Sequence, residues 1–242
     1  MKRSIWVCLF VVVVAAGAVT PASAQSVPDD EWNVFVAPYL LGAAMSGTTT
    51  VRSLEVDVDV SASDILSNLQ FGAMGVAAAR KGEWGFATDL IWMALGTTVR
   101  ETNVDFNQGA FAFYGLRRLS AAAELTFGLR VNTLQGELTF KGPDITRNQN
   151  KTWVDPIVGV NFQTPTRRRV KFRLYTEVGG FGAGSDLTWQ VFPNLSVNLT
   201  KTASLEFGYR WLDLDYATGE GNEQFKYDVL TQGPVLGFGF QF

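Results

Sequence analysis

Histidine is absent from this chain of 242 residues. A serine or threonine nucleophile would therefore have no histidine base to activate it, which disfavours most hydrolytic mechanisms. Cysteine occurs once, as Cys8 in an apolar N-terminal stretch, so a disulfide within the chain is excluded. No run of about 18 apolar residues follows residue 24, and this excludes membrane-spanning helices in that part of the chain.

Residues 1–24 have the features of a cleaved secretory signal peptide. Lys2 and Arg3 precede an apolar stretch over 5–19, and Ala22-Ser-Ala24 precedes Gln25. The alternative, a membrane anchor, is disfavoured because the stretch is shorter than the ~20 residues that a spanning helix needs. Residues 25–242 are predicted to form a single domain, because no linker or fixed-period repeat divides them.

The predicted mature chain is acidic. Without Lys2 and Arg3 the 20 basic residues fall to 18, which against 23 acidic residues gives a net charge of −5. This balance offers no basic surface for nucleic acid.

The last residues of the chain alternate between two classes of side chain. One phase holds Leu230, Pro234, Leu236, Phe238, Phe240 and Phe242, and the other holds glycines and smaller groups. Such alternation predicts a strand whose two faces meet different media. The pattern suits a wall between lipid and an interior of small side chains.

Similar segments, separated by turn residues, run through the mature chain. They are predicted over 32–45, 70–81, 84–95, 107–118, 121–134, 152–163, 169–183, 186–199, 203–216 and 226–242. Every second connection is tight, and the longer ones lie at 46–69, 96–106, 135–151 and 217–225, except for a tight one near Gly184. This asymmetry predicts an all-β fold, a transmembrane antiparallel up-and-down β-barrel of about ten strands, with eight as the alternative.

The first long connection, over 46–69, is predicted to contain a short helix. Serine caps at Ser61 and Ser63 precede apolar residues at helical spacing, namely Ile65, Leu66 and Leu69. The apolar side of this helix would either cover the barrel mouth or form one wall of a site for an apolar ligand.

Aromatic residues mark the predicted outer face. Trp84 and Trp92 share one phase of a strand, and their spacing corresponds to about 20 Å along the membrane normal, close to the separation of two aromatic belts. The predicted girdle consists of Trp32, Trp84, Trp92, Trp189, Tyr209 and Trp211. The alternative, a soluble sandwich with core tryptophans, does not account for the asymmetry of the connections.

The opposite phase places eight charged residues in the lumen. They are Asp89, Glu124, Arg130, Lys171, Arg173, Glu177, Glu206 and Arg210. We expect two layers, with Glu124, Lys171, Arg173 and Glu206 nearer the periplasm and the other four at mid-height, and each layer balanced in charge. Because unpaired charges are costly away from water, paired charges that close the lumen are favoured, and an ion-conducting passage is the alternative.

The tail Phe238-Gly-Phe-Gln-Phe242 resembles the C-terminal strand of bacterial outer-membrane β-barrels. Together with residues 56–74, 178–190 and 205–216, it makes the chain resemble a family of small Gram-negative outer-membrane barrels, similar to the OmpA-like and opacity-type barrels. This resemblance implies location in the outer membrane, contact with its lipids and lipopolysaccharide, and assembly by the barrel-assembly machinery through Phe238, Phe240 and Phe242. A wall-anchoring role is not implied, because no peptidoglycan-binding segment follows Phe242.

Enzymes of this membrane, namely the omptin-type proteases, the phospholipases, the lipid A palmitoyltransferases and the lipid A deacylases, resemble one another in relying on histidine. No catalytic site is therefore predicted, and no cofactor. Two acidic pairs, Asp57 with Asp59 and Asp213 with Asp215, have the spacing of one strand face. They lack the glycine and ligand number of a calcium loop, which favours a solvated acidic rim over a metal site.

The sequence therefore supports three functional hypotheses. The first is an envelope or surface-interaction protein with a charge-filled lumen and no catalytic activity. The second is a narrow channel for small solutes or ions, and the third is a barrel that binds a lipid or another apolar ligand.

Overall fold

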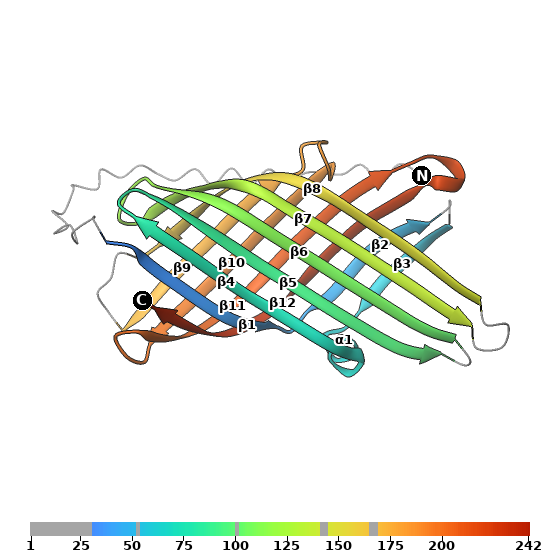
Figure 1. The fold of residues 1–242 in the computed structure, drawn as a ribbon, viewed down its shortest axis with the longest axis horizontal. Helices are drawn as coiled ribbons and strands as arrows, with labels where there is room; N and C mark the ends of the chain where they lie inside the picture. The colour runs from blue at the N-terminus through green and yellow to red at the C-terminus, as the bar shows by residue number, and fades with distance from the viewer. Residues whose placement is uncertain (1–30, 52–53, 100–101, 141–144, 165–168) are drawn as a thin grey trace.

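The computed structural model describes residues 31–51, 54–99, 102–140, 145–164 and 169–242 (Figure 1). The predicted signal peptide and the predicted turn over 165–168 lie outside these ranges. Twelve strands, one α-helix and one short 3-10 helix make up the described part. The strands are β1 (Asn33–Leu41), β2 (Ala44–Val51), β3 (Leu54–Val60), β4 (Leu69–Lys81), β5 (Trp84–Val99), β6 (Thr102–Arg118), β7 (Ala123–Phe140), β8 (Ile145–Gln163), β9 (Val170–Gly179), β10 (Leu187–Asn198), β11 (Ala203–Thr218) and β12 (Phe225–Gln241).

Ten of these strands close into an antiparallel barrel. The sheet runs from β1 through β4 and the following strands in chain order to β12, and β12 pairs with β1 to close the ring. The predicted up-and-down barrel of about ten strands is confirmed. In the described residues, no helix combines the length and the apolar character that crossing a membrane requires.

The two ends of the barrel differ. Asn33 and Gln241 lie at one end, here called the near end, where the described strand connections are tight. At the connection between β4 and β5, for example, Gly82 adopts a positive φ of 62°, a conformation that glycine reaches without steric cost. The opposite end, here called the far end, holds the outer tips of β5 to β8, which extend to the right in Figure 1.

Three of the four predicted long loops are wrong over most of their length, whereas the one over 217–225 is a connection between Thr218 and Phe225. Residues 44–51 and 54–60 form the β2 and β3 hairpin, β5 and β6 continue to Val99 and from Thr102, and β7 and β8 continue to Phe140 and from Ile145. The sequence pattern failed there because the far-end strands lack one uniformly apolar face, whereas their backbone ladders remain paired.

The helix α1 (Ala62–Asn68) lies where a helix was predicted. Its capping box is complete, since Ser61 accepts a hydrogen bond from the backbone of Asp64 and the Asp64 side chain accepts one from the backbone of Ser61. Ile65 is its buried residue and packs into the barrel interior, whereas Leu66 is exposed.

The strand β2 continues the line of β1 along β12, and β3 pairs with the other side of β2. The chain then passes through α1 into β4, whose first pair with β5 joins Leu69 to Leu95. The helix thus interrupts what would otherwise be one long descending strand. This interruption separates β3 from the far end of β5.

Alternation along each strand sorts side chains to the two faces of the wall. On β12 the buried positions include Tyr227, Val229 and Val235, and the exposed ones include Phe238 and Phe240. The inner face of the barrel is therefore packed, and the outer face carries large apolar groups.

Candidate functional site

A hydrogen-bonded triangle crosses the middle of the lumen. Arg210 on β11 donates to a carboxylate oxygen of Asp89 on β5 at 2.5 Å and to the Tyr39 hydroxyl of β1 at 2.8 Å. Tyr39 in turn donates to the other Asp89 oxygen at 2.7 Å. All three side chains are buried, and the Arg210 guanidinium also lies 4.7 Å from the ring centre of Phe192.

A second buried pair lies at a similar height on the other side of the lumen. Arg130 on β7 forms an ion pair with Glu177 on β9 and donates to the Thr188 hydroxyl of β10 at 3.3 Å. The remaining Glu177 oxygen accepts a hydrogen bond of 2.5 Å from Tyr175. Both charges are thus satisfied by several partners, as a buried pair requires.

The near-end layer has a different composition from the one predicted. Glu124 on β7 pairs in bidentate geometry with Arg80 on β4, at 2.7 and 2.9 Å, rather than with a predicted lumen cation. Arg173 lies over the ring of Phe35 at 5.3 Å, and Glu206 accepts hydrogen bonds of 2.7 Å from two serines, Ser196 and Ser204.

Lys171 is the remaining predicted lumen residue. It is partly buried on β9, where it faces Ser196 of β10 in the strand register. Within the described ranges it forms no ion pair.

A third polar centre was missed from the sequence. Asp155 on β8 is fully buried and accepts hydrogen bonds from Asn132, at 2.6 Å, and from the backbone and hydroxyl of Ser185, at 2.6 and 2.9 Å. The Ser185 hydroxyl also accepts a hydrogen bond from the Trp153 indole at 2.9 Å. Asp155 therefore fixes the tight β9–β10 turn against the inner wall.

The alternation of β8 contains the signal for Asp155, since Trp153, Asp155 and Ile157 share the inner phase. Arg80 likewise shares the inner phase of β4 with Ala78. Adding these two residues changes the charge distribution, because the near-end layer gains a cation and the middle layer gains a carboxylate. The predicted balance within each layer is wrong, because the near-end layer has one cation in excess and the middle layer has one carboxylate in excess.

The far half of the interior is apolar. Trp153 of β8 stacks on Tyr216 of β11, with 4.2 Å between ring centres and 7° between ring planes, and contacts Tyr227 of β12 at 6.4 Å. Ile65 of α1 is buried in the same cluster. Other members include Leu41, Ala43, Met45, Ile91, Met93, Ala110, Leu134, Leu214, Phe225, Val229 and Val235.

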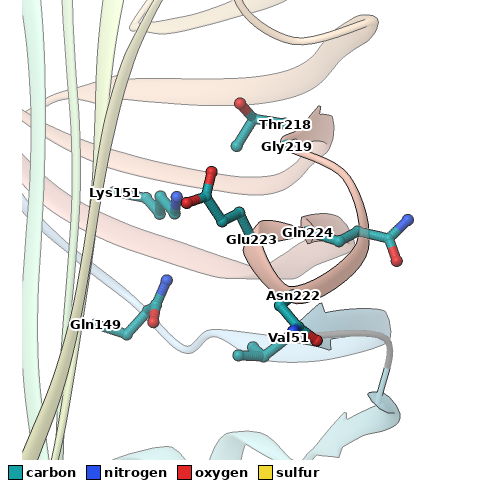
Figure 2. Close-up of a pocket in the computed structure, with 8 residues that line it drawn as sticks. All are labelled: Val51, Gln149, Lys151, Thr218, Gly219, Asn222, Glu223 and Gln224. Carbon is teal, nitrogen blue, oxygen red and sulfur yellow. The ribbon is translucent and has the colours of Figure 1, made fainter.

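A pocket of about 310 Å³ lies above this cluster at the far end (Figure 2). Its lining is mainly polar and comes from β8, from the tip of β2 and from the connection between β11 and β12. The lining residues are Val51, Gln149, Lys151, Thr218, Gly219, Asn222, Glu223 and Gln224. The Lys151 ammonium also lies 5.5 Å from the ring centre of Phe225, a member of the apolar cluster. The pocket and the apolar cluster are therefore adjacent.

The predicted girdle residues belong to the outer phase of their strands or, for Trp32, precede the first strand. Trp84 is exposed near one end of β5, with the Arg117 guanidinium 4.7 Å from its ring centre, whereas Trp92 stacks on Phe111 farther along. On the opposite side of the barrel, Trp211 packs against Tyr209. Trp189 lies beside these on β10, and Trp32 is exposed at the near end.

The predicted assembly residues Phe238, Phe240 and Phe242 are all exposed on the outer face at the near end. Asp57 and Asp59 lie on the outer face of β3, and Asp213 and Asp215 lie on that of β11. No group of three or more aspartate, glutamate, cysteine or histidine residues in the described structure has a geometry that would hold a metal ion.

Comparison with solved structures places this fold among outer-membrane barrels. The outer-membrane protease OmpT from Escherichia coli aligns over 91% of this chain and 99% of its own, with a TM-score of 0.52 and 8% identity. Ail, the attachment invasion locus protein of Yersinia pestis, aligns over 88% and 99%, with a TM-score of 0.42 and 10% identity. At this level of identity the similarity to OmpT demonstrates a shared fold alone. No protein-family model and no curated protein matches the sequence.

Proposed function

We propose that this protein is an integral outer-membrane barrel with a sealed lumen, which acts through its extracellular end as an envelope or surface-interaction protein without catalysis. The near end, with its tight turns, faces the periplasm, and the far end, with its long paired strands, faces the exterior. This orientation follows the usual asymmetry of such barrels.

The observation that carries the proposal is contact across the lumen at three levels. Arg173 of β9 lies over Phe35 of β1 near the periplasm, Arg210 joins Asp89 at mid-height, and Trp153 of β8 reaches Tyr227 of β12 at the far end. In each case three strands separate the partners along the shorter path around the barrel. Barrels of about this size are filled by side chains, and these contacts fill the present one.

The outer face supports residence in the membrane. Phe86, Phe113 and Leu129 are all more than half exposed although they lie in the middle strands of the barrel wall. Exposed apolar side chains of this density are unfavourable in water and favourable against lipid tails. Outer-membrane lipids and lipopolysaccharide are therefore the proposed surroundings of this band, with Phe238, Phe240 and Phe242 as the signal read by the barrel-assembly machinery.

A conducting lumen fits these contacts less well. An ion on the barrel axis would have to pass between the Arg210 and Arg130 networks, in which each guanidinium is paired with a carboxylate, although Arg210 Nε has no hydrogen-bond partner in the described structure. Opening such a network would expose buried charges to an incompletely hydrated passage, which costs several kcal/mol. Catalysis is also disfavoured, because the absence of histidine removes the base on which the omptin-type proteases depend.

A second candidate function, binding of an apolar ligand, is favoured by the apolar far half of the lumen. The side chains of that region, including Ile65, Met93 and Trp153, are buried by one another. A ligand would have to displace some of these side chains. Movement of α1, which carries Ile65, would make room for it. Apolar molecules that copurify with the folded protein and are lost in an Ile65→Asp variant would support this second function over the first.

Solute efflux from liposomes tests the sealed lumen. Vesicles that contain the folded protein and a trapped fluorescent dye or small sugar should retain their contents as well as protein-free vesicles do. A known open porin at the same protein-to-lipid ratio serves as the positive control. Rapid release through the folded protein would contradict the proposal.

A further inference from the structure

The strand β3 is an open edge of the sheet. It pairs with β2 from Leu54 to Val60, and no described strand pairs with its other side. The pairing of β4 with β5 begins only at Leu69 and Leu95, and the part of β5 beyond Leu95 pairs with β6 alone, so β5 does not cover this edge. Alternate residues of an edge strand direct unpaired backbone N–H and C=O groups outward, where they are able to pair with an added strand.

The helix α1 keeps this edge open. Its seven residues connect the end of β3 to the start of β4, and Ile65 is buried among residues of the barrel interior. Because the chain leaves the sheet after Val60 and rejoins it at Leu69, pairing with β5 begins after the helix and does not include β3. The sheet is therefore interrupted between β3 and β5 at the far end.

The side chains of β3 form two regular faces. Val60 lies opposite Met45, which is buried, so the phase of Leu54, Val56, Val58 and Val60 faces inward. Leu54 and Val56 are nevertheless 68% and 48% exposed. The other phase, Glu55, Asp57 and Asp59, is exposed, and the structure shows no cation paired with these carboxylates within the described residues.

We propose that β3 accepts an extended segment of another protein, in which lysine or arginine alternates with apolar residues, as an added antiparallel strand. Its backbone would pair with the open edge, its apolar residues would cover Leu54 and Val56, and its cations would lie beside Glu55, Asp57 and Asp59. Main-chain pairing supplies affinity in such strand addition, and the alternating side chains supply specificity.

Charge selects this partner over a second copy of the chain. Two β3 edges paired with each other would place carboxylates beside carboxylates, which is destabilising. Arg169, the described residue of the basic run at 167–169, directly precedes β9 at the near end, whereas β3 lies at the far end. This part of the same molecule therefore does not meet the edge.

The inference specifies the surface-interaction role proposed above and does not depend on a sealed lumen. A fluorescent peptide of seven residues, in which four lysines alternate with three valines, is the probe. We expect saturable binding to the folded protein in detergent or nanodiscs, with slowed hydrogen exchange confined to Leu54–Val60. A peptide with the same composition but with its lysines grouped together should bind at least tenfold more weakly.

Charge reversal at the edge distinguishes strand addition from general attraction to an acidic surface. The double variant D57K/D59K should weaken binding about tenfold, since two opposite-charge neighbours become like-charge neighbours. The matched control D215K/D228K changes the net charge by the same amount on β11 and β12, where both strand edges are paired. It should change binding by no more than about twofold.

Equal losses in the two double variants, protection outside β3, or no binding by the alternating peptide would overturn the proposal. A peptide with N-methyl groups on every second amide adds a backbone test, since one of the two possible sets should abolish binding and the other should not. Failure of these experiments would leave the result of the efflux assay unchanged, so the two proposals fail separately.

Discussion

Arg210 on β11 and Asp89 on β5 are joined by a hydrogen bond of 2.5 Å, although three strands separate them along one side of the barrel and five along the other. Tyr39 hydrogen-bonds to both residues and so joins β1 to the same group. The Arg210 and Asp89 side chains therefore join nearly opposite walls of the barrel. They occupy the part of the lumen through which a pore would have to run.

Removal of the Arg210 side chain should destabilise the barrel strongly. Arg210→Ala leaves the Asp89 carboxylate buried without its cation, and loss of one partner of a buried pair costs about 3–5 kcal/mol. The control is Arg169→Ala, which removes an exposed arginine and should cost less than about 1 kcal/mol. Urea unfolding in lipid vesicles measures both free energies, and equal costs would argue against a structural role for the pair.

The buried carboxylate of Asp155 should control the β9–β10 turn. Asp155→Asn leaves one acceptor oxygen, whereas both oxygens of Asp155 now accept hydrogen bonds from Ser185 and Asn132. The population of molecules with an open turn should therefore rise by about tenfold or more. Phe181 in this turn is 60% exposed and has a φ of 52°. Chymotrypsin should therefore cleave after Phe181 faster in the variant. Asp186→Asn, at an exposed position nearby, is the control and should leave the cleavage rate close to that of the unchanged protein.

The aromatic stack at the far end should contribute substantially to stability. Trp153→Ala removes the ring that contacts Tyr216 and the indole that donates to Ser185, with an expected cost of about 3–5 kcal/mol. Trp153→Phe keeps an aromatic ring and should cost less. Trp32→Ala, at an exposed tryptophan, should have little effect on the unfolding midpoint, and a similar shift for both alanine variants would disprove the far-end packing.

Lipid contact is testable at two positions on the same face of β7. Leu129 lies among the exposed apolar residues of the outer wall, and Gln135, six residues farther along the strand, is polar. Leu129→Arg should cost about 2–4 kcal/mol and Gln135→Arg no more than about 1 kcal/mol, because the penalty for a cation declines from the membrane midplane to the interface. Unfolding in vesicles checks the difference, which should vanish if the band does not face lipid.

Much of the barrel is predictable from the sequence, because each wall strand carries large apolar groups on its exposed outer face and packs its other face into the interior. The alternation of β12 and the inner phase that carries Arg130 on β7 and Arg210 on β11 follow from this asymmetry. Period-two patterns report which face a residue occupies. They therefore predict the inner phase well.

Pairing within the lumen is not predictable in the same way. Glu124 meets Arg80, not a neighbour on an adjacent strand, because strand tilt and register determine which inner residues share a height. The extension of β5 to β8 was missed for a related reason, since far-end residues such as Thr97 and Gln135 lack the apolar phase that marked the wall strands. Backbone pairing continues there without a hydrophobic signal.

The open edge of β3 shows a further limit. The alternation of residues 55–60 is visible in the sequence, and a helix after it was predicted, but the pairing of β2 with β12 was not. Because β2 pairs with β12, β3 lies on the far-end side of the first residue of β4. One edge of β3 is then left without a described partner strand. Only the register of distant strands reveals this edge.

The sealed lumen is the central claim, and single-channel recording tests it most directly. Folded protein, identified by its faster migration on gels before boiling, is inserted into planar lipid bilayers under an applied voltage. The cross-lumen contacts of Arg210, Arg130 and Trp153 predict no unitary currents at concentrations where an open porin gives many. Reproducible unitary currents whose size changes in Arg130→Ala or Arg210→Ala would contradict the claim and identify the protein as a channel.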